Sequence, residues 1–217
     1  MWRDFPDALG RRTGCPAFVY SRAGHGTSPP PIMAPGVRFM HEEATIVLPA
    51  LLSQFHIDTP VLVGHSDGGS IALIYAGTRP ARGLILLAPH VFVEDLSLQS
   101  IRRMRELYAT TDLRARLAKY HADVDAAFRG WNDVWLDPAF REWNIEEYLP
   151  AITCPVLVLQ GEDDEYGTRA QVDAIAAQVT GPVVVELLPR CGHSPHRDQR
   201  DVVLDRMAGF LSRLTGA

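Results

Sequence analysis

A serine, two aspartates and a histidine stand in this chain where their side chains could perform nucleophilic catalysis. The serine lies in the run Gly64-His65-Ser66-Asp67-Gly68, between an apolar segment at 60–63 and a second one at 69–76. This pattern predicts a strand, a sharp turn with Ser66 at its apex, and a helix. The glycines two residues before and two residues after the serine would let the backbone take a strained turn while the helix packs close behind it. We therefore predict that Ser66 presents its hydroxyl as a nucleophile.

Two segments further along the chain supply an acid and a base for this serine. The apolar run 155–160 ends at Gly161-Glu162-Asp163-Asp164, so both aspartates lie just past a predicted strand. Another apolar run, 183–188, leads to His193. Histidine can remove a serine proton near neutral pH because its reference pKa is about 6.5, and a buried carboxylate can hold the imidazole in one tautomer. His193 is the candidate base, and either Asp163 or Asp164 could orient it.

Short apolar segments alternate with longer amphipathic ones along most of the chain. Strands are predicted near 17–20, 60–63, 84–87, 155–160 and 183–188. A helix is predicted from His41 to Gln54, with an apolar face formed by Ile46, Val47, Leu51 and Leu52. Between Glu94 and Tyr148 the strand pattern stops and helical spacing takes over. The pattern predicts the α/β class, with a mostly parallel sheet flanked by helices and a helical insertion.

Three stretches carry a resemblance to a known family. Residues 63–69, 159–164 and 191–196 look like signatures of the α/β-hydrolase fold, and the loop at 20–28 is similar to a glycine-rich loop near that family's active-site mouth. The resemblance covers nearly the whole chain, and the order serine, acid, histidine is the one this family uses. It implies that Ser66 is the nucleophile and His193 the base. It also favours Asp164 as the acid, with Asp163 in reserve.

The resemblance further implies an oxyanion hole and a lid. One oxyanion donor would be the backbone N–H of Asp67, the residue after the nucleophile. In this family a loop after the first strands carries the second donor, and both would precede Met1. We therefore expect an N-terminally truncated core, and we expect its enzymatic activity to be weakened. The core is predicted at 1–93 and 149–217, with a lid at 94–148. Four lid aromatics could line a substrate pocket or pack the lid against the core: Trp131, Trp135, Phe140 and Trp143.

Composition and residue spacing limit the classes of partner and cofactor that the chain could bind. The 217 residues carry a formal net charge of −5, which argues against a nucleic-acid partner. The sequence contains no signal peptide and no apolar run of the roughly 20 residues that a membrane span needs, so we expect a cytoplasmic protein without a membrane partner. The three cysteines are far apart and favour reduced thiols, and Pro195 between His193 and His196 disfavours a metal site. No cofactor or metal is predicted.

The residues together predict a serine hydrolase that acts on a small acyl substrate. Ser66 would attack the carbonyl of an ester, thioester, lactone or amide and form an acyl-enzyme. The alternatives are a binding protein that keeps the fold without catalysis, an inactive fragment of a longer hydrolase, and an acyltransferase that excludes water.

Without the strands expected before Met1, an exposed sheet edge would favour a homo-oligomer. His90, just past the strand at 84–87, borders the pocket or lies in an ordinary loop, and Cys191 is interpreted as packing.

Overall fold

The computed structural model describes residues 1–31 and 35–215. Contacts among them divide the chain into two compact units. The first contains Met1–Ala17, Met40–Phe92 and Asn144–Ala217, and the second contains Phe18–Phe39 and Val93–Trp143. The second unit thus takes in residues 18–39, which the sequence analysis assigns to the core. The boundaries at 93 and 149, and the role of 94–148 as a lid, stay predictions.

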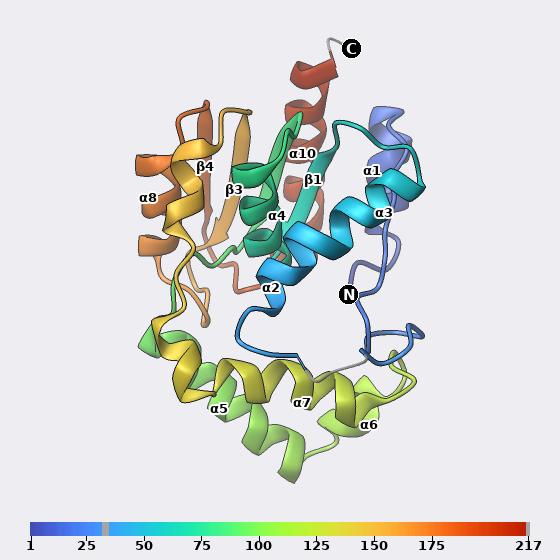
Figure 1. Cartoon of the computed structure of the whole chain (residues 1–217), viewed down its shortest axis with the longest axis vertical. Helices are drawn as coiled ribbons and strands as arrows, with labels where there is room; N and C mark the ends of the chain where they lie inside the picture. Colours follow the sequence, from blue (N-terminus) through green and yellow to red (C-terminus); the bar gives the residue numbers. More distant parts are fainter. Residues whose placement is uncertain (32–34, 216–217) are drawn as a thin grey trace. The chain divides into compact units, whose positions relative to one another are not determined.

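A four-stranded parallel sheet forms the centre of the first unit, as predicted. Its strands are β1 (Val61–His65), β2 (Gly83–Leu87), β3 (Val156–Gly161) and β4 (Val183–Leu188), and their spatial order is β1-β2-β3-β4 (Figure 1). The register pairs His65 with Leu87 and Gly161 with Leu188. Because all four strands run the same way, their carboxyl ends meet at one edge of the sheet. The loops that follow the four strands therefore lie at that edge.

Helices cover both faces of this sheet, which explains why every residue of β2 and β3 is buried. On one face, α1 (Phe5–Thr13) and α10 (Arg200–Thr215) pack against alternate strand residues such as Ile85 and Leu157. On the other face lie α4 (Asp67–Thr78) and α8 (Arg169–Gln178), together with the 3-10 helix η3 (Glu146–Ala151). The four-residue helix α9 (Pro195–Asp198) precedes α10.

The strand predicted at Ala17–Tyr20 is wrong. Residues 14–20 have no regular secondary structure, and Phe18 and Val19 are 40% and 54% exposed. An apolar run becomes a strand only where a neighbouring strand satisfies its backbone groups, and sequence alone does not show whether such a neighbour exists. Within the described residues, β1 pairs with β2 alone and forms one edge of the sheet.

The helix predicted at His41–Gln54 exists, but its buried face differs from the prediction. It runs as α2 (Phe39–Glu42), a π-helical turn η1 (Glu43–Val47) and α3 (Leu48–Gln54). In that turn the Leu48 N–H reaches back five residues to the Glu43 carbonyl, just before Pro49, which has no N–H to donate. A π-helical turn contains one more residue than an α-helical turn, which changes the side chains that face the core. Ile46, predicted on the buried face, is 64% exposed. The buried side chains are Met40, Ala44, Leu48 and Leu52.

The second unit is helical, as predicted for this stretch. It contains α5 (Asp95–Thr110), α6 (Leu113–Leu117), α7 (Val124–Trp135) and the 3-10 helix η2 (Pro138–Glu142). Trp135, Phe140 and Trp143 are at most 7% exposed and their rings contact one another, which favours packing over pocket lining for these three. Trp131 is partly exposed and meets Phe128 edge-on.

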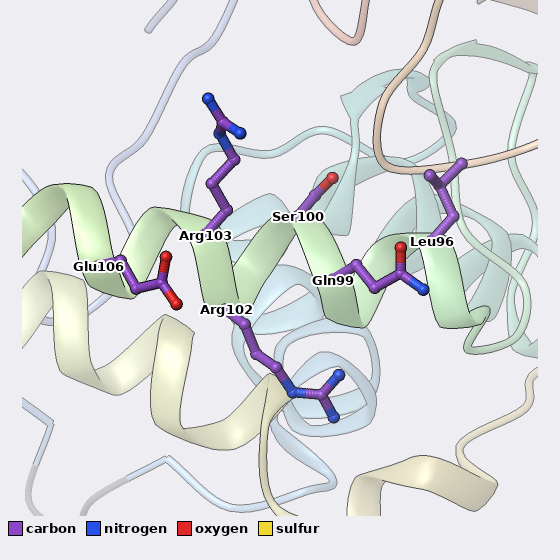
Figure 2. A pocket seen from close by; sticks show the side chains of 6 residues that line it. All are labelled: Leu96, Gln99, Ser100, Arg102, Arg103 and Glu106. Carbon is purple, nitrogen blue, oxygen red and sulfur yellow. The ribbon is translucent and has the colours of Figure 1, made fainter.

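A hollow of about 430 Å³ lies along α5 in the second unit. Its polar side chains leave the helix in different directions, with Arg102 and Arg103 on opposite sides (Figure 2). They do not converge on one point, as the polar groups of a specific small-molecule site do. Of the helices that the structure describes, none combines the length and apolarity needed to cross a membrane.

Helix α4 packs closely against strand β1 and the segment after β2 at two glycines near the predicted nucleophile. A Cβ on Gly64 would lie 2.2 Å from the Gly68 carbonyl oxygen, and one on Gly69 would lie 2.9 Å from Pro89. A Cβ on Gly68 would meet nothing within 4 Å. The close approach of helix to strand, which the sequence analysis assigned to the glycines two before and two after the serine, therefore requires glycine at 64 and 69 but not at 68.

We predict that Gly64→Ala lowers the free energy of unfolding by about 3 kcal/mol, because backbone on both sides of the new methyl group must move. The matched variant Gly68→Ala should leave that free energy unchanged or raise it by up to about 1 kcal/mol, since alanine favours a helix over glycine. Urea unfolding followed by circular dichroism measures both. Equal losses in the two variants would contradict the assigned contact.

Candidate active site

Ser66 lies between β1 and α4 in a backbone conformation that serine rarely adopts. Its φ is 53° and its ψ is −123°, and its N–H donates to the Leu87 carbonyl of β2 at 2.9 Å. Such a conformation costs about 1–3 kcal/mol and persists only where the surrounding structure enforces it. Here the conformation is held by the hydrogen bond to β2 and by the close packing of α4 against β1. This is the sharp, strained turn that the sequence pattern predicts.

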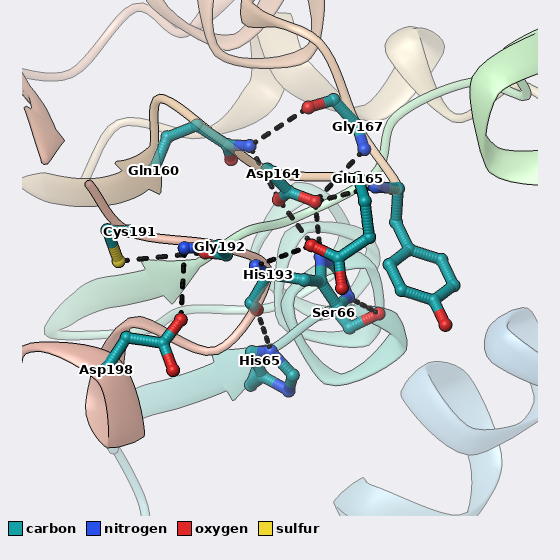
Figure 3. Close-up of polar contacts among 11 residues, drawn as sticks. His65, Ser66, Gln160, Asp164, Glu165, Gly167, Cys191, Gly192, His193 and Asp198 are labelled. Carbon is teal, nitrogen blue, oxygen red and sulfur yellow. Dashed lines mark hydrogen bonds and ion pairs between the residues drawn. The ribbon is translucent and has the colours of Figure 1, made fainter. Parts of the chain in front are cut away.

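The three predicted residues Ser66, His193 and Asp164 meet at the carboxyl edge of the sheet (Figure 3). Ser66 comes from the end of β1, Asp164 from the loop after β3, and His193 from the loop after β4. His193 Nε2 lies 2.9 Å from Ser66 Oγ, and His193 Nδ1 lies 2.9 Å from each carboxylate oxygen of Asp164. Because a carboxylate accepts hydrogen bonds, Nδ1 carries the proton, and Nε2 of the neutral ring can accept from the serine hydroxyl.

Asp164 is held in place by several donors besides His193. Gln160 Nε2 donates to Oδ2 at 2.7 Å, and the N–H groups of Tyr166 and Gly167 donate to Oδ1 at 2.8 and 3.3 Å. Burial alone would raise the pKa of Asp164. The hydrogen bond and charge of His193 and the Tyr166 N–H together outweigh burial and hold the pKa of Asp164 below its ordinary value. Asp164 therefore stays an acceptor at neutral pH.

Asp163, the reserve candidate, is not brought to the histidine. Its side chain is exposed on the turn, and its backbone N–H donates to the Cys191 carbonyl at 2.9 Å. Asp164 is 9% exposed by comparison. Of the two aspartates, the structure therefore places only Asp164 where it can orient His193.

The loop that carries His193 is tied down by side chains from three other segments. Asp198 Oδ2 accepts from the Gly192 N–H at 3.0 Å, and Glu165 Oε2 accepts from the His193 N–H at 3.2 Å. His65 Nε2 donates to the His193 carbonyl at 2.6 Å (Figure 3). The segments are α9, the β3–α8 loop and β1.

Two further rings lie beside His193. The Tyr166 ring lies 4.6 Å from the His193 ring between centroids, and the buried His90 ring lies at 5.6 Å. The placement of His90 agrees with a residue that borders the site. Burial raises the pKa of Tyr166 to about 12, and burial followed by the charge of His193 lowers the pKa of His90 to about 3. Neither side chain carries a charge at neutral pH.

Cys191 and Asp67 occupy the positions that the sequence suggested. Cys191 is 1% exposed and belongs to the hydrophobic core, and burial followed by the charge of Asp198 raises the pKa of its thiol to about 11. It is therefore a packed thiol and not a thiolate nucleophile. Asp67 begins α4, so its backbone N–H lies in the first turn, at the positive end of the helix dipole. Its role as an oxyanion donor stays a prediction.

Sequence reasoning missed the residues that support the triad. Gln160 lies four positions before Asp164 in the same strand and its loop, and His65 and Glu165 are direct neighbours of Ser66 and Asp164. Polar side chains this close to a predicted site were the available signal for all three. The partner of Gln160 is Asp164 in the same segment, whereas His65 and Glu165 bond to His193 on the loop after β4, so those two contacts depend on how the strands are placed. No group of three or more His, Cys, Asp or Glu side chains within 1–31 and 35–215 is arranged to hold a metal ion.

Three histidines of the first unit make its stability depend on pH. Burial is the main cause that lowers the pKa of His65 and His90 to about 3 and that of His196 to about 4. In the unfolded chain these groups take up protons near pH 6.5, so the unfolded state binds more protons between about pH 6.5 and pH 4. The free energy of unfolding should be highest above about pH 6.5 and fall as the pH drops, by up to about 1.4 kcal/mol per pH unit for each histidine.

Urea unfolding at a series of pH values measures this slope. In His196→Phe the slope should decrease by the contribution of one histidine, because one of the three proton-binding groups is removed from the unfolded chain. A free energy of unfolding that stays flat between about pH 6.5 and pH 4.5 would contradict the assignment of buried neutral histidines.

Comparisons with known proteins show the family of the chain. The profile of the alpha/beta hydrolase family matches residues 1–206. The serine hydrolase BPHL of Mus musculus is 25% identical over 181 residues, covering 80% of this chain and 61% of that protein. Protein phosphatase methylesterase 1 of Bos taurus is 31% identical over 103 residues, covering 46% of this chain and 22% of that protein. The matched segment thus spans less than two thirds of either relative.

Solved structures show the same fold. An esterase from Exiguobacterium antarcticum superimposes with a TM-score of 0.72 at 19% sequence identity, covering 96% of this chain and 87% of that one. The parallel sheet, the strained serine between β1 and α4, and the family profile over residues 1–206 lead to one conclusion. The chain belongs to the alpha/beta hydrolase family.

Proposed function

We propose that this chain is a serine hydrolase that cleaves a small ester, thioester, lactone or amide through an acyl-enzyme on Ser66. The observation that carries the proposal is the continuous hydrogen-bond relay from Ser66 Oγ through His193 to Asp164, with each step at 2.9 Å. A serine hydroxyl becomes a nucleophile when a base stands within hydrogen-bond reach and a third group orients that base.

In the first half of the reaction, Ser66 Oγ attacks the acyl carbonyl carbon while its proton passes to His193 Nε2. The carbonyl π electrons move onto oxygen, and the Asp67 N–H at the start of α4 is the proposed donor to that oxyanion. The Asp164 carboxylate stabilises the imidazolium that has formed. When the tetrahedral centre collapses, the bond to the leaving group breaks and His193 returns the proton to it. An alcohol, thiol or amine departs.

In the second half, water attacks the ester formed on Ser66. His193 Nε2 takes the water proton, the new tetrahedral centre collapses, and the proton returns to Ser66 Oγ as the carboxylic acid leaves. The same relay therefore serves both halves, and the protein ends in its starting protonation state. An acyltransferase would differ only in the second acceptor, an alcohol or amine in place of water.

The substrate class rests on the residue at the apex and on the relatives. Serine at this position forms an ester intermediate, which favours acyl substrates over halides and epoxides, for which related enzymes use aspartate. Two of the similar proteins are described as an esterase and a methylesterase, and a third as a serine hydrolase. Esters are therefore the first substrates to test.

We predict that a fluorophosphonate labels the chain once, on the peptide that contains Ser66, and that Ser66→Ala abolishes the label. Asp164→Asn should lower the labelling rate and the turnover of short esters by about 10⁴-fold, because an amide in place of the carboxylate favours the wrong imidazole tautomer. The exposed neighbour provides the matched control, and Asp163→Asn should behave like the unsubstituted chain. Intact-mass analysis with peptide mapping measures the label.

A folded chain that takes no label would contradict the proposal and favour the non-catalytic binding protein. Labelling without ester turnover, followed by transfer of the acyl group to an added alcohol or amine, would favour the acyltransferase.

A further inference from the structure

We propose that His65 is a positioning residue that holds the catalytic base by donating Nε2–H to the backbone carbonyl of His193. The role rests on the proposed function of Ser66 and His193. It ties the loop that carries the base to the strand that carries the nucleophile.

The geometry of this contact fixes its chemistry. His65 Nε2 lies 2.6 Å from the His193 carbonyl oxygen. A carbonyl oxygen only accepts hydrogen bonds, so the proton of the neutral His65 ring is on Nε2. His65 is the last residue of β1 and is covalently joined to Ser66. A single side chain therefore connects the backbone beside the nucleophile to the backbone of the base, although 127 positions separate Ser66 and His193 in the chain.

Aromatic neighbours keep the His65 ring in this orientation. Its centroid lies 5.0 Å from the His193 ring, 4.9 Å from the His196 ring and 6.4 Å from the Trp2 ring, the last two in edge-on arrangements. His196 occupies the same cluster and is 3% exposed. Neither of its ring nitrogens has a hydrogen-bond partner among the described residues. The two histidines thus share a packing environment, but only His65 bonds to the loop of the base.

The neutral state of His65 is compatible with the positive charge that forms on His193 during the proposed reaction. Burial, together with the charge of His193, lowers the pKa of His65 to about 3, so the ring stays neutral at the pH where an ester hydrolase works. When His193 becomes an imidazolium, a neutral donor beside it adds no repulsion, whereas a lysine or arginine at this position would. The residue therefore supplies a hydrogen bond without opposing protonation of the base.

Three other side chains that hold the loop act from more exposed positions. Glu165 and Asp198 accept from the N–H groups of His193 and Gly192, and Gln199 donates to the Pro189 carbonyl, all in bonds exposed to solvent. Water competes with such bonds more than with a partly buried one. His65 bonds to the carbonyl of His193, in the peptide that follows the base, whereas the two carboxylates bond to peptides that precede it. Losing His65 should therefore let the loop rotate about its remaining attachments.

A displaced loop would move His193 Nε2 away from Ser66 Oγ. Misplacement of a reacting group by about 1 Å can lower a rate on the order of a hundredfold. The loss should appear in kcat and in the rate of covalent labelling, and not in KM, because the contact does not touch a substrate.

The experiment compares three variants of the full chain. His65→Phe keeps an aromatic ring but removes the donor. His65→Gln restores an N–H donor the same number of bonds from the backbone as Nε2. His196→Phe removes a histidine from the same cluster that makes no hydrogen bond to the loop. Two readouts are measured: the rate of Ser66 labelling by a fluorophosphonate, and amide hydrogen exchange of the peptide spanning 189–195.

His65→Phe should slow labelling by about tenfold to a hundredfold and speed exchange in 189–195. His65→Gln should recover most of both, and His196→Phe should change neither. Unchanged labelling and exchange in His65→Phe, or equal effects in His196→Phe, would overturn the proposal. If the unsubstituted chain takes no label but exchange responds as expected, the proposed hydrolase function fails while the contact stands.

A measurement on the unsubstituted chain covers the case in which His65→Phe does not fold. Nitrogen-15 NMR of the imidazoles should show His65 neutral and protonated on Nε2 from about pH 5 to pH 9, as its depressed pKa and its carbonyl partner require. A ring protonated on Nδ1, or one that titrates near pH 6.5, would overturn the proposal.

Discussion

The arrangement at the carboxyl edge of the sheet depends on one imidazole that faces two partners at once. His193 accepts from Ser66 on one nitrogen and donates to Asp164 on the other, and the two partners lie on opposite sides of the ring. Each of the three side chains follows a different strand of one parallel sheet. Parallel strands bring their carboxyl ends to a common edge, so the sheet itself sets the distances that the relay needs. The glycine contact between β1 and α4 then aims the serine hydroxyl at that edge.

The rings and the thiol beside the relay are neutral. Burial lowers the pKa of His65 and His90 and raises that of Tyr166 and Cys191, so none of these groups is charged at neutral pH. The single negative charge of Asp164 is balanced by four donors. An imidazolium that forms on His193 during the reaction thus has the Asp164 carboxylate on its Nδ1 and no cation among the rings packed against it. This arrangement favours proton transfer from the serine to the histidine.

Sequence reasoning found the triad because each member follows an apolar strand in an order that only a few folds use. Ser66 and His193 could be named without a structure for that reason, and the resemblance to the α/β-hydrolase fold favoured Asp164 over Asp163 as the acid. The contact of His65 with the His193 carbonyl could not be named, since it depends on the placement of two segments far apart in the chain. The Gln160 contact is local, but it depends on the conformation of the loop after β3. The strand expected at 17–20 was wrong because an apolar run says nothing about its partner. The helix face was wrong because a π-helical turn before Pro49 shifts the phase of a 3.6-residue period.

An acyl-enzyme on Ser66 can be detected by mass spectrometry of the chain quenched in acid during its first turnovers on an activated ester, p-nitrophenyl acetate. We expect an acetyl group on the Ser66 peptide that disappears as the ester is consumed. The group should be absent from Ser66→Ala. Hydrolysis of the ester at the same rate in Ser66→Ala, with no acyl group on the protein at any time, would contradict an acyl-enzyme mechanism at this serine.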